Sequence, residues 1–156
     1  MKGYSSDLYI LAFDHRGTLT KGLLGVEGRA PSGDEIARVS SMKDIIFDGF
    51  LEARNQGIEG GDPAILVDEA FGIQVQEKAK EMGIKFAAPV EKSGQKVFDF
   101  EYGDEFGEKI KEVNADFVKI LVRWNPDDDT DTRQIQGERI KTLSDWLDEN
   151  ERKFLL

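Results

Sequence analysis

Cysteine is absent from the 156 residues, and histidine occurs once, at His15. Without thiols the chain forms neither disulfides nor thiolate zinc sites. Proline is scarce, with four residues, and no apolar run is long enough to span a bilayer. Residues 1–7 are polar and do not resemble a signal sequence, so we expect a cytoplasmic protein.

Positive charge is also in short supply. The chain has 21 Lys and Arg against 31 Asp and Glu, which gives a formal net charge of -10. This charge argues against nucleic acid and anionic membranes as partners, because both attract cationic proteins. A small anionic substrate remains compatible, because local charge in a site can oppose the net charge. With 39% hydrophobic and 33% charged residues, the composition is that of one soluble domain.

Apolar runs typical of strands alternate along the chain with helical patterns. We expect strands at 8–13, 64–67, 84–90, 117–123 and, in part, 153–156. We expect helices at about 32–55, 71–82, 104–113 and from about 132 to 147, and a long glycine-rich loop at 18–31. This alternation predicts a parallel α/β sheet with right-handed crossovers.

Two architectures fit this order: a five-strand doubly wound sheet, and a (β/α)₈ TIM barrel interrupted near its middle. Asp14, Asp68, Glu91 and Arg123 all follow predicted strands, so each strand followed by a helix delivers ionisable groups to one rim, as in barrel enzymes. The final apolar run stops within a strand. We therefore predict the N-terminal part of a single barrel domain over 1–156, comprising four βα units and the start of strand five.

Lys119 is the strongest candidate for a functional side chain. Strand alternation places Val118 and Ile120 on an apolar face and Lys119 on the opposite face. An unpaired buried ammonium is costly, so Lys119 needs a carboxylate, an anionic ligand or a polar cavity. The structural alternative is an ion pair with Glu91 or Asp68.

Asp14 and Arg16 follow the first strand and are candidates for proton transfer and anion binding, respectively. A salt bridge at the end of the strand explains them equally well. His15 lies between them, and alternation turns it away from Asp14, so we assign it a structural role.

Three further residues follow the second and third strands. Glu91 is a candidate for proton transfer, and Lys92 is a candidate for substrate binding. Both belong to a segment in which Ala87 and Pro89 leave room for a ligand. Asp68 is a substrate-binding candidate, although it is better placed to cap the helix that follows.

An acidic run after the fourth strand imitates a calcium loop. Asp127, Asp129, Asp131 and Glu138 occupy loop positions 1, 3, 5 and 12. Position 6 is Thr132 instead of glycine, and a strand precedes the run, so we expect a solvated loop and helix N-terminus and no bound metal. The chain also lacks nucleotide-binding glycine motifs.

Five segments occur in an order that matches a known family: 11–17 (LAFDHRG), 89–95 (PVEKSGQ), 98–103 (FDFEYG), 118–126 (VKILVRWNP) and 133–147. Together they cover nearly all of the chain. The sequence resembles the DUF2090 domain, which is found fused to the sugar kinase 5-dehydro-2-deoxygluconokinase. That domain is related to 2-deoxy-5-keto-gluconate-6-phosphate aldolase and, more distantly, to tagatose 1,6-bisphosphate aldolase.

The resemblance implies a class I aldolase barrel acting on a keto-sugar phosphate without a cofactor. Asp14 and Arg16 are similar to the D-x-R of strand one in the tagatose relatives, and Lys119 is similar to the lysine of their strand-four K-V-L. Their Schiff-base lysine would lie beyond Leu156, so Lys119 is expected to be a supporting lysine and residues 1–156 alone are expected to be inactive. Arg16 and Arg123 would bind anionic oxygens, and Asp14 and Glu91 would move protons.

Two other functions remain open. A divalent-metal lyase would use Asp14, Asp68 and Glu91 as oxygen ligands. A silent barrel would bind a sugar phosphate as a sensor or as an appendage of a kinase. The expected partners are a small sugar phosphate and either a second copy of the chain or a fused sugar kinase domain.

Overall fold

The computed structural model describes residues 3–58 and 60–156. Within this part the chain forms two compact units, which we call the N-terminal unit (Tyr4–Ala88) and the C-terminal unit (Pro89–Leu156). Both contain strands that pair in parallel and helices that connect them, so the predicted α/β class is confirmed. The assignment to the first half of a barrel stays a prediction.

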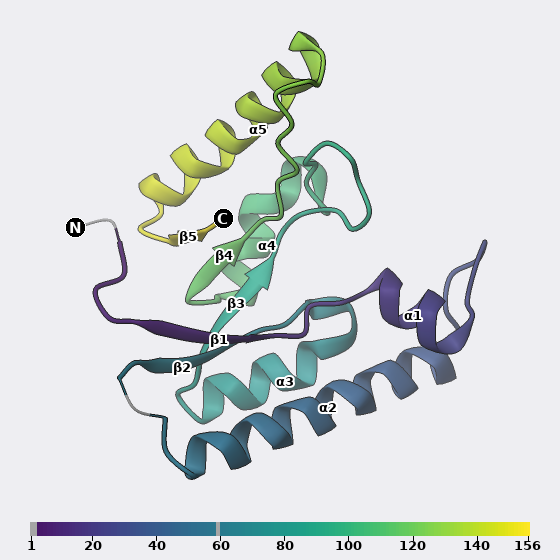
Figure 1. Cartoon of the computed structure of the whole chain (residues 1–156), viewed down its shortest axis with the longest axis vertical. Helices are drawn as coiled ribbons and strands as arrows, with labels where there is room; N and C mark the ends of the chain where they lie inside the picture. Colours follow the sequence, from purple (N-terminus) through teal and green to yellow (C-terminus); the bar gives the residue numbers. More distant parts are fainter. Residues whose placement is uncertain (1–2, 59) are drawn as a thin grey trace. The chain divides into compact units, whose positions relative to one another are not determined.

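In the N-terminal unit the strands lie in the order β1-β2-β3. Its elements are β1 (Leu8–Ala12), α1 (Gly17–Leu24), α2 (Gly33–Asn55), β2 (Asp62–Leu66), α3 (Glu69–Glu81) and β3 (Lys85–Pro89). The crossover helices α2 and α3 pack side by side on the same side of β1 and β2 (Figure 1). This arrangement is the one expected for successive right-handed crossovers that advance in one direction.

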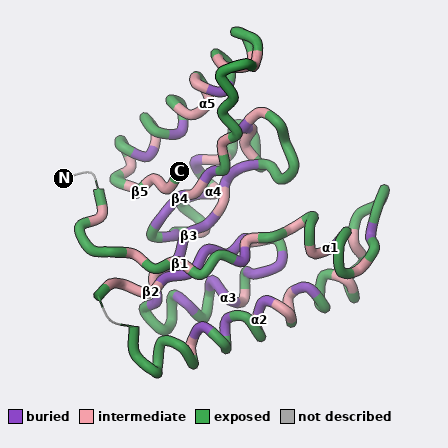
Figure 2. The backbone as a smooth tube through the Cα atoms, in the orientation of Figure 1, coloured by how far each residue is buried: buried purple, intermediate pink, exposed green. Residues whose placement is uncertain are grey.

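Helix α2 begins where the sequence predicts it. Ser32 is its N-cap, and the Ser32 hydroxyl and the Glu35 carboxylate form a reciprocal capping box. The buried face of α2 carries Val39, Phe47 and Phe50, and Figure 2 shows the matching buried stripe along the helix. The apolar stripe and the cap together explain the length of this helix.

One expectation for the first residues of the N-terminal unit is wrong. Residues 17–24 form α1 instead of a loop, and Gly25 ends this helix in the left-handed conformation at φ 65°. The strand β1 is not fully buried, because Tyr9 and Leu11 are 47% and 42% exposed. β1 is first in the strand order, so it pairs with β2 on one edge.

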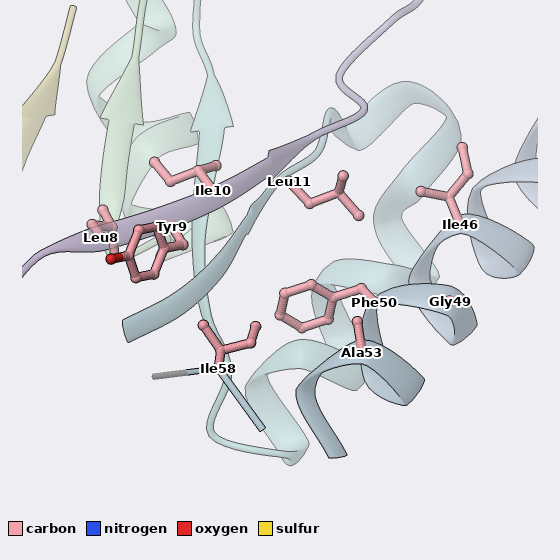
Figure 3. Close-up of a pocket in the computed structure, with 9 residues that line it drawn as sticks. All are labelled: Leu8, Tyr9, Ile10, Leu11, Ile46, Gly49, Phe50, Ala53 and Ile58. Carbon is pink, nitrogen blue, oxygen red and sulfur yellow. The ribbon is translucent and has the colours of Figure 1, made fainter. Parts of the chain in front are cut away.

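An apolar groove of about 640 Å³ lies between β1 and α2 (Figure 3). Its lining residues are Leu8, Tyr9, Ile10, Leu11, Ile46, Gly49, Phe50, Ala53 and Ile58. The lining contains no carboxylate, ammonium or guanidinium group. A site for a charged sugar phosphate requires such groups, so this groove is separate from the chemistry considered below.

The C-terminal unit is built around β4 (Phe117–Lys119), which pairs in parallel with β5 (Lys153–Leu155). A 3₁₀ turn (Gly103–Glu105) leads into α4 (Phe106–Val113), and α5 (Thr130–Glu149) connects β4 to β5. The strand β4 is shorter than predicted, although the Ile120 N–H continues the pairing by donating to the Leu155 carbonyl at 3.1 Å.

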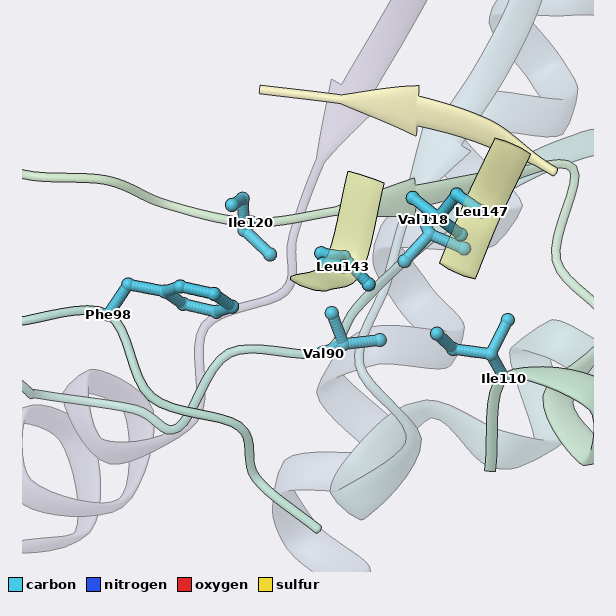
Figure 4. Packing of buried hydrophobic residues seen from close by; sticks show 7 residues of the cluster. All are labelled: Val90, Phe98, Ile110, Val118, Ile120, Leu143 and Leu147. Carbon is cyan, nitrogen blue, oxygen red and sulfur yellow. The ribbon is translucent and has the colours of Figure 1, made fainter. Parts of the chain in front are cut away.

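The core of the C-terminal unit is one apolar cluster (Figure 4). It comprises Val90, Phe98, Ile110, Val118, Ile120, Leu143 and Leu147. Val118 and Ile120 are each 2% exposed, so the predicted apolar face of β4 is confirmed. Alternation then places Lys119 on the face opposite this core.

Candidate functional site

Lys119 and Glu91 form an ion pair within the C-terminal unit. The Lys119 Nζ donates to Glu91 Oε1 at 2.8 Å, and the two side chains are 15% and 8% exposed. Backbone pairing brings them together, because the Val90 N–H donates to the Lys119 carbonyl at 3.0 Å. Of the partners considered for Lys119, the structure shows a carboxylate, that of Glu91, which is the pairing that the structural alternative expects.

The segments that follow Glu91 and Lys119 are tied to α5 by Gln136. The Gln136 side chain, 2% exposed, accepts from the Phe98 N–H at 3.0 Å and donates to the Arg123 carbonyl at 3.1 Å. Arg139 donates to the Phe98 carbonyl at 2.7 Å. One buried amide thus holds both the segment after Glu91 and the segment after Lys119 in place.

The predicted cations of these loops lie on the surface. Arg123 is exposed, and its guanidinium donates to the Gln95 carbonyl at 3.2 Å. Lys92 is also exposed, and its backbone N–H donates to the Asp99 carbonyl at 2.8 Å. Both side chains are therefore accessible to an anion in solution.

In the N-terminal unit, Asp68 has a different partner from the one considered in the sequence. The Lys43 ammonium, on α2, donates to the Asp68 carboxylate and to the Phe13 carbonyl, the latter at 2.7 Å. The two side chains are 0% and 1% exposed. Lys43 thereby connects Phe13, which follows β1, to Asp68, which follows β2.

Asp68 is also the N-cap of α3, as predicted. Its second carboxylate oxygen accepts from the Phe71 N–H at 3.0 Å. With one oxygen on the ammonium and the other on the helix terminus, this carboxylate is fully used in holding the fold. We therefore assign Asp68 a structural role and do not retain it as a substrate-binding residue.

Burial outweighs pairing in this ion pair. Desolvation raises the pKa of Asp68 above its ordinary value, against the opposing effect of Lys43. Desolvation also lowers the pKa of Lys43, against the opposing effect of Asp68. The two shifts agree that the interior disfavours both charges, so the pair contributes little net stability although each partner depends on the other.

Asp14 and Arg16 follow β1 in the same unit and are both partly buried, whereas His15 between them is exposed. The charge of Asp14 raises the pKa of Lys43 and the charge of Arg16 lowers it, so both side chains lie near the Lys43–Asp68 pair. The Phe13 carbonyl that Lys43 binds immediately precedes Asp14. Lys43 thus fixes the backbone from which Asp14 and Arg16 project.

Lys43 is the residue that the sequence analysis missed. It lies four residues after Val39 and four before Phe47, both of which are 0% exposed, so it occupies the buried stripe of α2. A lysine within an apolar stripe at helical spacing is the signal that identifies it. Gly72 provides space for it, because a Cβ there would lie 3.4 Å from the Lys43 Cδ and 2.3 Å from the Val67 Cγ2.

Metal binding finds little support in this geometry. Among residues 3–58 and 60–156, no group of three or more carboxylate or imidazole side chains is arranged to hold an ion. Of the proposed ligands, Asp68 is already used by Lys43 and Phe71, and Glu91 is paired with Lys119. In the acidic run, Asp129 caps α5 by accepting from the Thr132 N–H at 2.8 Å, which agrees with the expected helix N-terminus.

Comparison with known proteins adds one finding. No significant match is found among curated proteins. No helix in the described ranges has the length and apolarity that crossing a membrane requires. All of the chain, residues 1–156, matches the family described as "Uncharacterized protein conserved in bacteria (DUF2090)". The chain therefore belongs to the DUF2090 family.

Proposed function

We propose that this protein is a class I aldolase-type lyase domain for a keto-sugar phosphate, built on the first βα units of a (β/α)₈ barrel. The observation that carries the proposal is the Lys119–Glu91 pair, at 2.8 Å, where β3 and β4 give way to loops. Groups at the carboxyl ends of parallel strands are where barrel enzymes perform their chemistry. The Lys119 side chain is 15% exposed and the Glu91 side chain is 8% exposed.

In the proposed reaction, Lys119 and Glu91 have different roles. In retro-aldol cleavage, a base takes the proton of the substrate hydroxyl, the adjacent C–C bond breaks, and its electron pair moves into an iminium formed by a lysine. Glu91 supplies the carboxylate that accepts this proton. Lys119, paired with Glu91, stabilises developing negative charge and is not the attacking amine. By resemblance, the attacking amine belongs to a later strand.

Anion binding is assigned to the exposed cations of the same unit. Arg123 and Lys92 lie on the loops that follow Lys119 and Glu91. Arg16 and Asp14 of the N-terminal unit keep their predicted roles in anion binding and proton transfer. Because these side chains are proposed to act on a bound ligand, single substitutions of them should leave the free energy of unfolding nearly unchanged.

The test is turnover of a panel of ketose phosphates by the full-length protein, followed by coupled detection of triose phosphate. We expect Lys119→Met and Glu91→Gln each to lower kcat by about 10²-fold or more, the usual contribution of acid–base groups. Lys153→Met is the matched control, because Lys153 is an exposed lysine at the start of β5 and should be neutral. Unchanged turnover in both site variants would end the proposal.

A non-catalytic sugar-phosphate sensor is the second candidate. It uses the same ion pair, because the Lys119 ammonium can hold an anionic oxygen of a ligand whether or not the ligand is then cleaved. Borohydride reduction in the presence of a ketose phosphate separates the two functions. A lyase of this class is trapped as a covalent adduct with added substrate mass, whereas a sensor binds the same ligand and gives no adduct.

A further inference from the structure

The outer side of helix α2 carries a large apolar side chain in contact with water. Ile45, in the middle of the helix, is 71% exposed. Lys43 and Phe47, two residues before and after it, are 0% exposed, because this spacing places them on the opposite side of the helix. A single exposed isoleucine is ordinary on a protein surface, so its surroundings decide whether it marks an interface.

The surroundings of Ile45 are apolar or small. Ile46, Gly49 and Ala53 line the apolar groove beside β1 (Figure 3). Ser41 and Gly49 lie four residues before and after Ile45, so both are one turn away on the same side of the helix. Among the described residues, nothing lies within 4 Å of the position that a Cβ of Gly49 would take. The backbone beside Ile45 is therefore open to the close approach of another helix.

The charges on this side of α2 are placed symmetrically about Ile45. Arg38 lies seven residues before it and Glu52 seven residues after it, and both are exposed. Seven residues make nearly two helical turns, so the three side chains form one stripe, with its charges about 21 Å apart along the axis. A second copy of the stripe, laid antiparallel with Ile45 opposite Ile45, brings a guanidinium to a carboxylate at both ends. A parallel copy would oppose like charges.

We infer that the outer side of α2 is a self-association surface, on which two copies of this protein pair antiparallel about a two-fold axis at Ile45. Contacts across such an axis occur twice, so the Ile45 contact is flanked by two Arg38–Glu52 ion pairs. Ser41 of each copy lies opposite the partner's Gly49, and these small residues permit the usual helix separation of about 8–10 Å. The charge order of the stripe matches itself, which favours a second copy as the occupant. The inference does not depend on the proposed function.

Sedimentation velocity of the whole protein at about 1–100 μM tests the surface, because one helix pair is a small interface and should dissociate in the micromolar range. Ile45→Asp should raise the dissociation constant of the dimer by about tenfold or more, because it buries two like charges at the axis. Ile73→Asp is the matched control, because Ile73 is 49% exposed on α3 and should be neutral. Circular dichroism verifies that each variant is folded.

Charge reversal tests the antiparallel register. Arg38→Glu opposes carboxylates at both ends of the stripe, and Glu52→Arg opposes guanidinium groups, so each variant alone should be monomeric over the same concentrations. An equal mixture of the two variants restores an opposite pair at each end and should dimerise like the wild type. A mixture that stays monomeric, or single variants that dimerise normally, would overturn the inference.

A unique thiol tests the position of the axis, because the chain contains no cysteine. Ile45→Cys should form an intermolecular disulfide on oxidation with diamide, whereas Ile73→Cys should not. Ser41→Cys places the two thiols about 12 Å apart along the helices and should also fail to couple. Wild type that is monomeric at every concentration would overturn the inference and leave the stripe to a different protein partner. A dimer indifferent to Ile45→Asp would place the interface elsewhere and overturn it as well.

Discussion

Two lysine–carboxylate pairs in this protein have the same chemistry and opposite surroundings. Lys43–Asp68 is sealed, with both side chains at 1% exposure or less, whereas Lys119–Glu91 is 15% and 8% exposed. The sealed pair binds a strand end and a helix terminus, and the open pair joins the last residue of β4 to the segment after β3. Burial therefore distinguishes a pair that maintains the fold from a pair that can meet a ligand.

The largest expected effect comes from breaking the sealed pair. Lys43→Met leaves the Asp68 carboxylate buried without its partner, and we expect a loss of about 3–5 kcal/mol in the free energy of unfolding. Urea unfolding followed by circular dichroism measures it.

The double variant Lys43→Met/Asp68→Asn is the matched control for that experiment. It removes both charges, and asparagine keeps the N-cap of α3. We expect it to be more stable than Lys43→Met alone. Additive losses would show that the two side chains do not depend on each other.

The same pair predicts a pH dependence with a definite sign. Because the pKa of Asp68 is raised in the folded state, its contribution to stability falls as pH rises from 3.8 through the folded value. Because the pKa of Lys43 is lowered, stability rises with pH between the folded value and 10.5. Unfolding curves across these windows should show both slopes in the wild type and lose them in the double variant.

The open pair should respond in the opposite way. Lys119→Met should cost less stability than Lys43→Met, because the Lys119 side chain is 15% exposed and that of Lys43 is sealed, yet it should lower turnover or ligand affinity. Urea unfolding and the ketose phosphate assay, applied to the same two variants, give a direct contrast. Equal loss of stability in both would remove the distinction between sealed and open pairs.

A smaller effect tests the space that Gly72 gives to Lys43. A Cβ at Gly72 would lie 2.3 Å from the Val67 Cγ2, so Gly72→Ala should cost about 1–3 kcal/mol through overpacking. Gly49→Ala in α2 is the control, because nothing lies within 4 Å of its Cβ position. That change should stabilise the helix by roughly 0.5–1 kcal/mol.

The smallest effect concerns the N-terminus of α2. The Arg29 guanidinium and the Ser32 N–H lower the pKa of Glu35 to about 2. A lowered carboxylate pKa contributes stability above 4.5 that is lost as pH falls through the folded value. Glu35→Gln should therefore flatten the acid limb of the stability curve slightly, since the group is exposed and screened.

The open pair was predictable from the sequence and the sealed pair was not. Strand alternation around Lys119 identifies its face, and the parallel neighbour supplies Glu91. Lys43 lies on α2, and lysines on helices usually face solvent. Its residue type alone therefore does not indicate that it is buried. Its identification depends on noticing that it shares a stripe with Val39 and Phe47.

The fold shows a similar division. The helices α2, α3 and α5 are predicted from their apolar spacing, and Asp68 is predicted to cap α3. In the structure their N-caps are Ser32, Asp68 and Asp129. Helix α1 escapes prediction, because the glycines in 17–24 lower its propensity. The partial exposure of β1 is also not predicted, because a short apolar run has the same pattern in an edge strand as in a buried strand.

The most direct test of the contrast between the two pairs is quantitative lysine acetylation read by mass spectrometry, with and without fructose 1,6-bisphosphate. We predict that Lys43 stays unmodified in both conditions, and that Lys119 is modified slowly in the free protein, whenever its amine separates from Glu91, and is protected by the sugar phosphate. Modification of Lys43 in the folded protein, or a Lys119 rate that ignores the ligand, would contradict the assignment of one pair to the fold and the other to a site.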